Sequence, residues 1–140
     1  MKKPERNLPD TNVIIRYLMK DDEAQYSKAK EFFDKVKNGS SKAIIIESVV
    51  AECIYVLTKI YRVPRTTAAE SLSDILHYRG IANDDQKELI HALALFSKRS
   101  LDIVDCILCA KTAKAEVSLF SFDDDLNKIA AVRPVEHGNS

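Results

Sequence analysis

Several acidic residues occupy positions at which a carboxylate is unusual, and carboxylates can hold a metal ion. Asp123 opens a block of three aspartates directly after the apolar run 119–122, and Asp10 follows the short segment 7–9. Ligands of open α/β sheets bind beyond the carboxyl ends of the strands. Both aspartates are therefore well placed for a hard cation, and each is equally well explained as a turn residue or a helix N-cap.

Glu52 lies in the middle of the apolar run 49–57, where its nearest helical neighbours are Val49, Tyr55 and Val56. A glutamate is seldom buried without a partner, because burial removes its hydration. A partly exposed glutamate that reaches Lys59 or Arg62 is an equally good interpretation of Glu52.

Asp105 interrupts the apolar run 101–108 in the same way. Asp102 and Asp105 both suit the positive end of a helix, an effect of about 0.3 to 1 kcal/mol. Asp102 fits that role better, which leaves Asp105 on the apolar side of the helix and favours a functional role for it.

Taken together, Asp10 and Asp123 terminate predicted strands, whereas Glu52 and Asp105 interrupt apolar helix faces. Four negative charges in one pocket repel one another strongly unless cations compensate them. An oxygen-rich site of this kind suits Mg²⁺ or Mn²⁺. We therefore expect these four carboxylates to converge on one crevice.

The elements that would position these residues alternate between strand and helix, which indicates α/β architecture with a mainly parallel sheet sandwiched by helices. Gly39 is placed to end the second helix, Thr11 or Asn12 to cap the first, and the spacing Thr67–Glu70 predicts a capping box. Pro9 is awkward in a central strand because it has no N–H to donate. The predicted strands are 7–10, 43–46, 80–82, 117–122 and an edge strand at 132–135, and the predicted helices are 11–18, 22–37, 48–61, one from 67, 84–97, 102–115 and 124–130.

The composition places these elements in one ordinary globular domain of 140 residues, which we assign to 1–135 with a polar tail at 136–140. Apolar residues make up 46% and charged residues 30%. No run approaches the roughly 20 apolar residues of a membrane span, and no signal peptide is visible, so we expect a cytoplasmic protein. The 21 basic and 21 acidic residues cancel, so no strongly basic nucleic-acid surface is predicted.

The glycines and cysteines exclude several other kinds of site. With only Gly39, Gly80 and Gly138, the chain has no dinucleotide-binding, P-loop or serine-hydrolase glycine motif. Cys106 and Cys109 have C-x-x-C spacing, but a structural zinc site would need a second pair. We expect all three cysteines of the chain to be small buried core residues rather than metal or redox groups.

At this point the motifs resemble a known family, the PIN-domain ribonucleases, and in particular the VapC-type toxins of toxin–antitoxin pairs. The resemblance spans residues 10 to about 129, with four motifs in order. These motifs are Asp10-Thr-Asn-Val-Ile-Ile-Arg-Tyr-Leu18 with Asp21-Asp22, Ser48-Val-Val-Ala-Glu-Cys-Ile-Tyr-Val-Leu57, Asp105-Cys-Ile-Leu-Cys-Ala110 and Leu119-Phe-Ser-Phe-Asp123.

The resemblance implies a PIN-like three-layer sandwich of about four to five short strands and about seven helices. It also implies which side chains form the site. The metal-binding and catalytic quartet would be Asp10, Glu52, Asp105 and Asp123. Asn12 and Ser121 would orient the carboxylates or waters by hydrogen bonds, Asp125 would be an auxiliary carboxylate, and Asp124 would cap the last helix.

The implied activity is Mg²⁺- or Mn²⁺-dependent endoribonuclease cleavage of RNA, as the toxin of a type II toxin–antitoxin pair. The implied partners are an RNA substrate, a cognate antitoxin and a second copy in a homodimer. Arg16, Lys59 and Arg62 are candidates to steer the RNA backbone, or are ordinary surface charges.

Two alternatives remain open at this stage. The first is a catalytically silent PIN scaffold that binds RNA or protein, which Pro9 favours. The second is a Mg²⁺-dependent phosphohydrolase or phospho-acceptor domain with Asp10-Thr11 as its nucleophile motif. The second is disfavoured because such a domain needs another aspartate two residues along, or an activating lysine after a strand, and position 12 is Asn.

Overall fold

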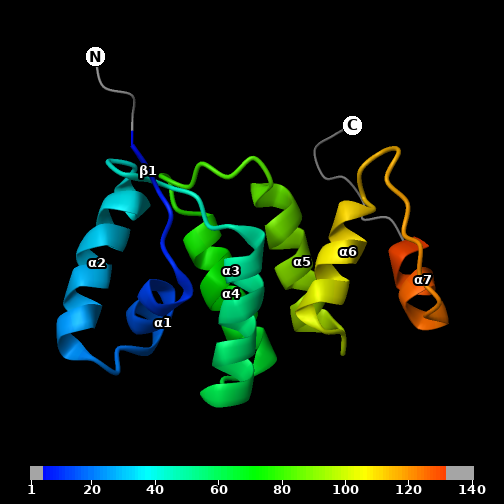
Figure 1. Ribbon diagram of the computed structural model, residues 1–140, viewed down its shortest axis with the longest axis horizontal. Coiled ribbons are helices and arrows are strands. Elements are labelled where there is room, and N and C mark those ends of the chain that lie inside the picture. Colours follow the sequence, from blue (N-terminus) through cyan, green and yellow to red (C-terminus); the bar gives the residue numbers. More distant parts are fainter. Residues whose placement is uncertain (1–4, 132–140) are drawn as a thin grey trace.

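The computed structural model describes residues 5–131. In Figure 1 the helices stand side by side, from α2 and α1 at one end of the row, through α3, α4 and α5, to α6 and α7 at the other. The elements in chain order are β1 (Arg6–Asn7), α1 (Thr11–Met19), α2 (Glu23–Asn38), β2 (Lys42–Ala43), α3 (Glu47–Tyr55), the π-helical turn η1 (Val56–Ile60), α4 (Arg65–Leu76), α5 (Gln86–Lys98), α6 (Ile103–Lys111) and α7 (Asp124–Ala131).

The sheet is parallel but short. Arg6 pairs with Lys42 and Asn7 with Ala43, and an isolated parallel bridge joins Ala43 to Ile81, where a brief strand was predicted. The α/β class and the parallel pairing are confirmed. Only two strands form within residues 5–131, so the sheet of four to five strands is not confirmed.

Pro9 explains why the first strand ends early. The ladder stops at Asn7, and Pro9, which is buried, lies outside it. A residue without an N–H cannot continue the ladder. The chain instead turns into α1, which begins at Thr11.

Residues 117–122 are irregular, although their apolar pattern predicts a strand. The segment makes local hydrogen bonds in place of a ladder: the N–H of Val117 donates to Lys114 O (3.4 Å) and the N–H of Asp123 donates to Ser121 Oγ (3.0 Å). Glu116, just before it, has a φ of 69°. The predicted edge strand at 132–135 and the polar tail at 136–140 lie outside the described residues.

The hydrophobic core is formed by the side chains on the inward face of each helix. Leu72, Ile75 and Leu76 of α4 are buried, and so are Leu89 and Leu93 of α5. The cysteines Cys53, Cys106 and Cys109 are free and buried, which confirms their interpretation as small core residues. No helix within residues 5–131 combines the length and the apolar character that a bilayer crossing requires.

The helix ends confirm some of the predicted caps and correct others. Gly39 ends α2 in the left-handed conformation, as expected, and Asp22 caps the start of that helix. Asp10, rather than Thr11 or Asn12, caps α1. The capping box at 67–70 is wrong, because Pro64 precedes a helix that already begins at Arg65.

Arg65 connects α4 to the turn between α5 and α6. Its Nη2 lies within 3.0 Å of the carbonyl oxygens of Phe96, Arg99 and Leu101, and its guanidinium lies 3.6 Å from the centre of the Phe96 ring. A guanidinium can donate several hydrogen bonds and stack on an aromatic face at once. The start of α6 is therefore fixed relative to α4.

Candidate active site

Asp10 lies at the N-terminus of α1, where the chain leaves the sheet. Its Oδ1 accepts a hydrogen bond from the N–H of Val13 (3.0 Å). Helix N-termini favour negative charge, because their first N–H groups are unpaired. Oδ2 has no hydrogen-bond partner among the described residues, and the side chain is exposed, so this oxygen is available to a ligand.

Thr11 links Asp10 to Glu52. The hydroxyl of Thr11, the first residue of α1, donates a hydrogen bond to Glu52 Oε1 on the neighbouring helix α3. Glu52 is exposed rather than buried, which decides between the two interpretations that the sequence left open. The buried stripe of α3 and η1 consists of Val50, Cys53, Ile54 and Leu57. Glu52 lies beside this stripe and needs no buried partner.

The thiol of Cys53 lies within the electrostatic influence of both Asp10 and Glu52. Burial, together with the negative charges of Glu52 and Asp10, raises the pKa of the Cys53 thiol to about 12. Such a thiol is protonated at neutral pH, and a protonated thiol is a poor nucleophile. Asp10 and Glu52 therefore form one local negative field above an inert cysteine.

Asp105 lies at the level of Glu52 on an adjacent helix. Helices α3 and α6 run in opposite directions (Figure 1), and Glu47 at the start of α3 pairs with Lys111 at the end of α6 (2.9 Å). At about 1.5 Å per residue, Asp105 lies about 9 Å from Lys111 along its axis and Glu52 about 7.5 Å from Glu47. Asp105 is half-buried, in the first turn of α6.

Asp123 is not brought to the other three carboxylates within one chain. It immediately precedes α7, which lies beyond α6 at the opposite end of the row from α1 (Figure 1). Its Oδ1 accepts a hydrogen bond from the N–H of Leu126 (3.1 Å), so Asp123, and not Asp124, caps α7. The role of the four residues as a metal-binding quartet stays a prediction.

Of the three predicted supporting residues, Asn12 lies next to Asp10, whereas Ser121 and Asp125 lie next to Asp123. Asn12 is exposed in the first turn of α1, next to Asp10. Ser121 is used locally: its hydroxyl accepts from the N–H of Asp123, and its carbonyl accepts from the side chain of Asn127 (2.9 Å). Asp125 is exposed in the first turn of α7.

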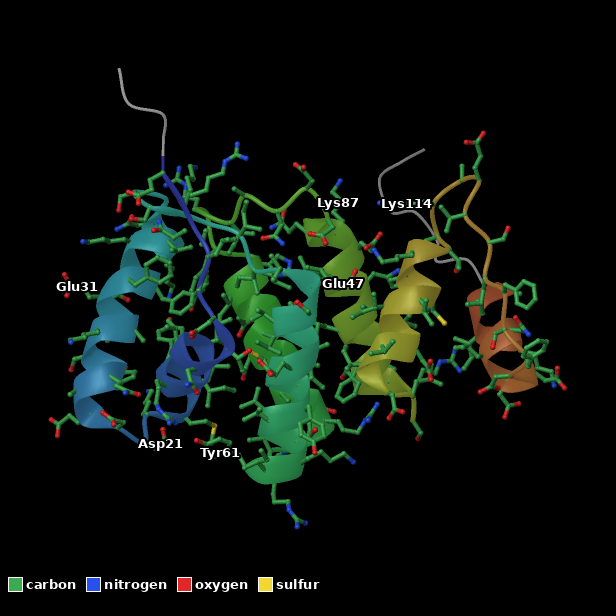
Figure 2. The ribbon with its side chains drawn as sticks, viewed as in Figure 1. Asp21, Glu31, Glu47, Tyr61, Lys87 and Lys114 are labelled. Carbon is green, nitrogen blue, oxygen red and sulfur yellow. The ribbon has the colours of Figure 1, made fainter. Side chains whose placement is uncertain are left out.

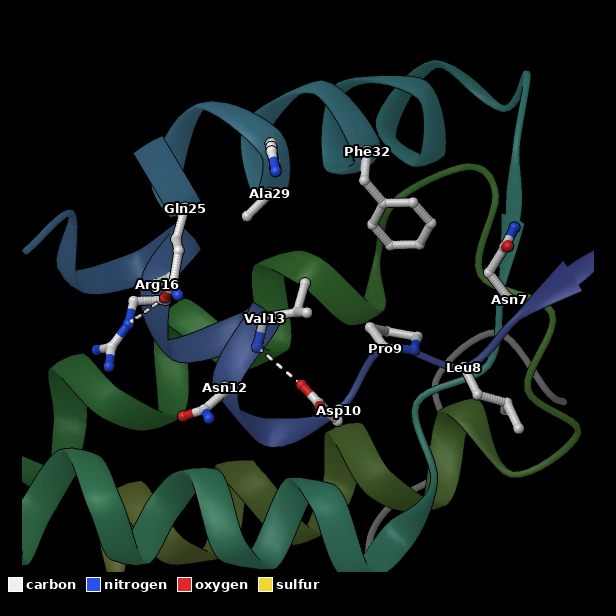
Figure 3. A pocket seen from close by; sticks show the side chains of 11 residues that line it. Asn7, Leu8, Pro9, Asp10, Asn12, Val13, Arg16, Gln25, Ala29 and Phe32 are labelled. Atoms are coloured by element: carbon white, nitrogen blue, oxygen red, sulfur yellow. Dashed lines mark hydrogen bonds between the residues drawn. The ribbon is translucent and has the colours of Figure 1, made fainter. Parts of the chain in front are cut away.

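A cavity of about 490 Å³ opens beside Asp10 (Figure 3). Leu8, Pro9 and Asp10 form one side of it, and α2 forms the other with Ala29 and Phe32. Its volume is within the range of ligand-binding pockets, about 300 to 1,000 Å³. The cavity therefore joins an apolar groove to the carboxylate of Asp10.

The candidate RNA-binding cations differ in how firmly they are held. The guanidinium of Arg16 donates to Gln25 Oε1 (2.8 Å) and to Asp21 Oδ1 (3.1 Å). The hydroxyl of Tyr61 donates to Asp21 Oδ2 (2.6 Å) and holds the pKa of that carboxyl below its usual range. Figure 2 shows Asp21 and Tyr61 near each other at one end of the molecule.

Lys59 and Arg62 are exposed just beyond this group, and Arg62 adopts a φ of 60°. Neither forms an ion pair within the described part of the chain. These two side chains are available to a polyanion, whereas Arg16 already has partners.

A second acidic group lies at the other end of α3. Oxygens of Glu47, Asp85 and Glu88 come within 4.8 Å of one another, and within residues 5–131 no other set of three such side chains does so. Two ammonium groups already contact it: Lys111 bonds to Glu47 (2.9 Å) and Glu88 (2.7 Å), and Lys114 lies 3.2 Å from Glu88. Figure 2 shows Glu47 and Lys114 at this end of the helices. These three carboxylates could hold a metal, but two of them, Glu47 and Glu88, are already paired with lysines.

Sequence reasoning missed Thr11 as the residue that joins two of the carboxylates. It was expected only as a helix cap, yet its hydroxyl reaches across to α3. A side-chain hydroxyl next to a capping aspartate is a weak signal, because Ser and Thr are common at helix starts for local reasons. Only the packing of α1 against α3 reveals this contact.

The donor set around Asp10 fits a hard divalent cation. Asp10 and Glu52 supply carboxylate oxygens, and each is oriented by a hydrogen bond that holds one of its oxygens. Mg²⁺ and Mn²⁺ prefer such ligands and retain several waters. The neighbouring thiol of Cys53 is protonated and buried, so it does not compete for a softer metal.

Comparison with known proteins gives two matches. The family model described as "PIN domain" matches residues 8–132. A curated protein of Aquifex aeolicus (strain VF5), named VapC ribonuclease, is 28% identical over 133 residues, which cover 92% of this chain and 97% of that protein. No solved structure matches at a comparable level of significance.

Proposed function

Because the chain belongs to the PIN domain family, we propose that it is a Mg²⁺- or Mn²⁺-dependent endoribonuclease and the toxin of a type II toxin–antitoxin pair. The match to a protein named VapC ribonuclease runs along nearly the whole of both chains and supports this assignment. The single structural observation that carries the proposal is the contact of Thr11 with Glu52, which ties the start of α1, where Asp10 lies, to the Glu52 side chain on α3.

The residues that would hold the ion are Asp10 and Glu52, with Asp105 at the same level on α6. Asp123 would become the fourth ligand only if the segment before α7 moved toward α1. When bound, Mg²⁺ or Mn²⁺ supplies an activated water and stabilises charge on the phosphate. The chain's own contribution is orientation. The N-terminus of α1 holds one oxygen of Asp10, and Thr11 holds one oxygen of Glu52. No serine, histidine or cysteine nucleophile is required.

RNA would approach over the exposed side chains of Lys59 and Arg62. Phosphate contacts of this kind position a nucleic acid without reading its sequence. Because the chain carries no net charge, attraction of the RNA would depend on Lys59 and Arg62 more than on the electrostatic field of the whole protein. Arg16 would contact the RNA as a cation of fixed position, because its guanidinium is held by a hydrogen bond to Asp21.

The partners follow from the same assignment. A cognate antitoxin would lay a peptide across the site, and a basic side chain of that peptide would pair with the carboxylates. The protein would act in the cytoplasm, as a homodimer. A small reading frame immediately upstream of the gene, with an antitoxin-like sequence, is the expected genetic arrangement.

The decisive experiment compares Asp10→Asn with Asp22→Asn. Each aspartate caps a helix with a side-chain bond of 3.0 Å to the N–H three residues on. Asparagine preserves such a cap, so both variants should fold and unfold like the original chain. We expect Asp10→Asn to abolish Mg²⁺-dependent RNA cleavage and Asp22→Asn to leave it intact.

Cleavage would be measured on a mixed pool of structured RNAs, with and without a chelator, on a gel. Full activity of Asp10→Asn, or equal loss in both variants, would contradict the assignment of Asp10. The test needs no knowledge of the natural RNA target.

A catalytically silent scaffold is the second candidate, and one observation favours it: Asp123 lies at the far end of the helix row from Asp10. A titration with Mn²⁺, measured by calorimetry, distinguishes the silent scaffold from the nuclease. A silent scaffold would show no binding that depends on Asp10 and Glu52. A nuclease would bind Mn²⁺ in a manner that both Asp10→Asn and Glu52→Gln weaken.

A further inference from the structure

The cavity beside Asp10 lies between one face of α1 and one face of α2. Gln25, Ala29 and Phe32 line it from α2, and Val13 lines it from α1 (Figure 3). Residues four and seven positions apart share one side of a helix, so the α2 residues form a continuous stripe along the cavity. The volume of about 490 Å³ leaves room for a ligand between the two helices.

The apolar part of this cavity includes an aromatic ring of fixed position. Phe32 is half-buried, and its ring makes an edge-to-face contact with the buried ring of Phe33, with centroids 5.0 Å apart. Ala29, which is buried, and Val13 continue the apolar surface. A fixed aromatic ring in an apolar surface suits a flat aromatic ligand, which can stack on it.

The polar part of the cavity offers amide groups that the protein does not use fully. Gln25 Oε1 accepts a hydrogen bond from Arg16 Nε (2.8 Å), and its Nε2 donates none to the residues that the structure describes. The side-chain amide of Asn12, which is exposed, likewise has no hydrogen bond within residues 5–131. An amide side chain carries both donors and an acceptor, and such groups read the edges of nucleobases.

The charges around the cavity favour an anion that reaches from one side to the other. Lys28 lines the cavity and forms no ion pair within the described part of the chain. Asp10 lines it as well, at the place where the proposed metal ion would meet a phosphate. A ligand in the cavity therefore lies next to the cleavage site and next to an unpaired ammonium.

We propose that this cavity receives one nucleobase of the RNA, from the nucleotide next to the phosphate that is cleaved. Given the proposed function, on which this assignment rests, the base lies against the Phe32 ring. Its edge meets the amides of Asn12 and Gln25, and the phosphate of the same nucleotide pairs with Lys28. The cavity thereby gives the enzyme a preference for one base, which contacts to phosphates alone cannot give.

The mixture of groups in the cavity favours a base over a purely apolar occupant. An apolar side chain would cover the amides of Asn12 and Gln25 without bonding to them, and a polar group that loses water without gaining a partner is costly. A nucleobase has a flat aromatic face and an edge of donors and acceptors, so it matches both parts of the cavity. Its edge is free only where the RNA is unpaired.

The first experiment measures RNA binding without cleavage. The probes are short, fluorescently labelled RNAs made of A, C or U, and an abasic ribose-phosphate chain of the same length, with a chelator present. We expect the original chain to bind at least one base-bearing RNA about tenfold more tightly than the abasic chain, because stacking of a base on an aromatic side chain contributes about this much. Equal affinity for all four probes would overturn the proposal.

The variant Ala29→Leu fills the cavity from α2, and Ala24→Leu is its matched control. Ala24 is exposed on the same helix and does not line the cavity. We expect Ala29→Leu to bind every probe as weakly as the abasic chain and Ala24→Leu to bind like the original chain. If Ala29→Leu has the circular dichroism of the original chain and keeps its preference for bases, the cavity serves another occupant, such as a peptide of a partner protein, and the proposal is overturned.

The second experiment changes the edge of the cavity without filling it. In Gln25→Glu the carboxylate still accepts the bond from Arg16 Nε, so the exposed side chain keeps its place and loses only its N–H donors. Ala24→Glu adds the same charge to the same helix, outside the cavity. Cleavage sites would be mapped on a mixed pool of RNAs, and the same two variants would be measured in the binding assay.

We expect Gln25→Glu to change the ratio of cleavage between the preferred base and the others by about fivefold, the value of one hydrogen bond. Ala24→Glu should lower the cleavage of all sequences alike and leave that ratio unchanged. A loss of structure would not produce this difference. The same ratio in Gln25→Glu as in the original chain would contradict the role of the Gln25 amide and, if Ala29→Leu does not fold, would overturn the proposal.

Failure of the base-binding cavity and failure of the proposed function give different results. If the original chain cleaves no RNA but Ala29→Leu abolishes base-dependent binding, the nuclease assignment fails and the cavity assignment holds. If the original chain cleaves RNA and the variants at Ala29 and Gln25 behave like those at Ala24, the nuclease assignment holds and the cavity assignment fails.

Discussion

The ion-pair network of Glu88 supports a quantitative prediction about stability. The Glu88 residue is only 8% exposed, and its Oε2 accepts a 2.7 Å hydrogen bond from Lys111. Burial alone would raise the pKa of Glu88, but the bonds from Lys111 and Lys114 outweigh it and hold that pKa below its usual value. The substitution Lys111→Met removes the shorter of these bonds and keeps the aliphatic stem.

The magnitude follows from the burial of the carboxylate. Removing one partner of a buried acceptor costs about 1 to 3 kcal/mol. Lys114 remains at 3.2 Å, and the Lys111 side chain is itself partly exposed, so we take about 2 kcal/mol. At about 3 to 4 °C per kcal/mol for a chain of this size, the melting temperature should fall by about 6 to 8 °C.

The assay is urea denaturation at about pH 7 and again at about pH 3.5, with Lys30→Met as the matched control. Lys30 pairs with Asp34 at the same 2.7 Å, but both side chains are about half exposed. Such a surface pair within one helix contributes about 0.3 to 0.5 kcal/mol. We therefore expect Lys111→Met to cost several times more than Lys30→Met at neutral pH.

The pH dependence has a definite sign. A carboxyl whose pKa is lowered by folding stabilises the protein above its unfolded pKa, about 4.3 for glutamate. That stability is lost as the pH falls through the folded pKa. The difference between the original chain and Lys111→Met should therefore narrow at about pH 3.5. Equal losses for the two lysine variants at neutral pH would refute the reasoning from burial.

The remaining predictions concern other contacts. Thr11→Val should lower RNA cleavage at least about tenfold without unfolding the protein, because Glu52 loses its orienting bond, and Thr11→Ser should restore it. Gly80→Ala should cost about 3 kcal/mol or more in urea denaturation, because a Cβ there would lie 2.0 Å from Ser41 O. The thiol of Cys53, with its pKa raised to about 12, should react with a disulfide reagent at about pH 8 only after unfolding.

Much of the helical architecture could be predicted because its signals are local. Asp22 and Gly39 bracket α2 through contacts within a few residues, and the apolar spacing of α4 and α5 marks their buried faces. The start of α4 was predicted two residues late, at Thr67. A proline at the N-cap already supplied a suitable extended backbone, so the capping box was not needed.

The irregular conformation of 117–122 could not be predicted, and the exposure of Glu52 could not be decided from the sequence, because both depend on distant partners. A strand needs a neighbour to accept its hydrogen bonds, and no pattern within 117–122 states which edge that is. Glu52 lies one position away from the buried residue Cys53, and a shift of one residue around a helix decides between core and solvent. The link from Thr11 to Glu52 likewise depends on how α1 packs against α3.

The contacts of Arg65 fix the direction in which α6 begins after the turn that joins it to α5. One guanidinium reaches the carbonyl oxygens of Phe96, Arg99 and Leu101 while it stacks on the Phe96 ring. A lysine has a single compact charge and cannot do both. A side chain on α4, remote in sequence from every predicted ligand, thereby sets the angle at which Asp105 is presented.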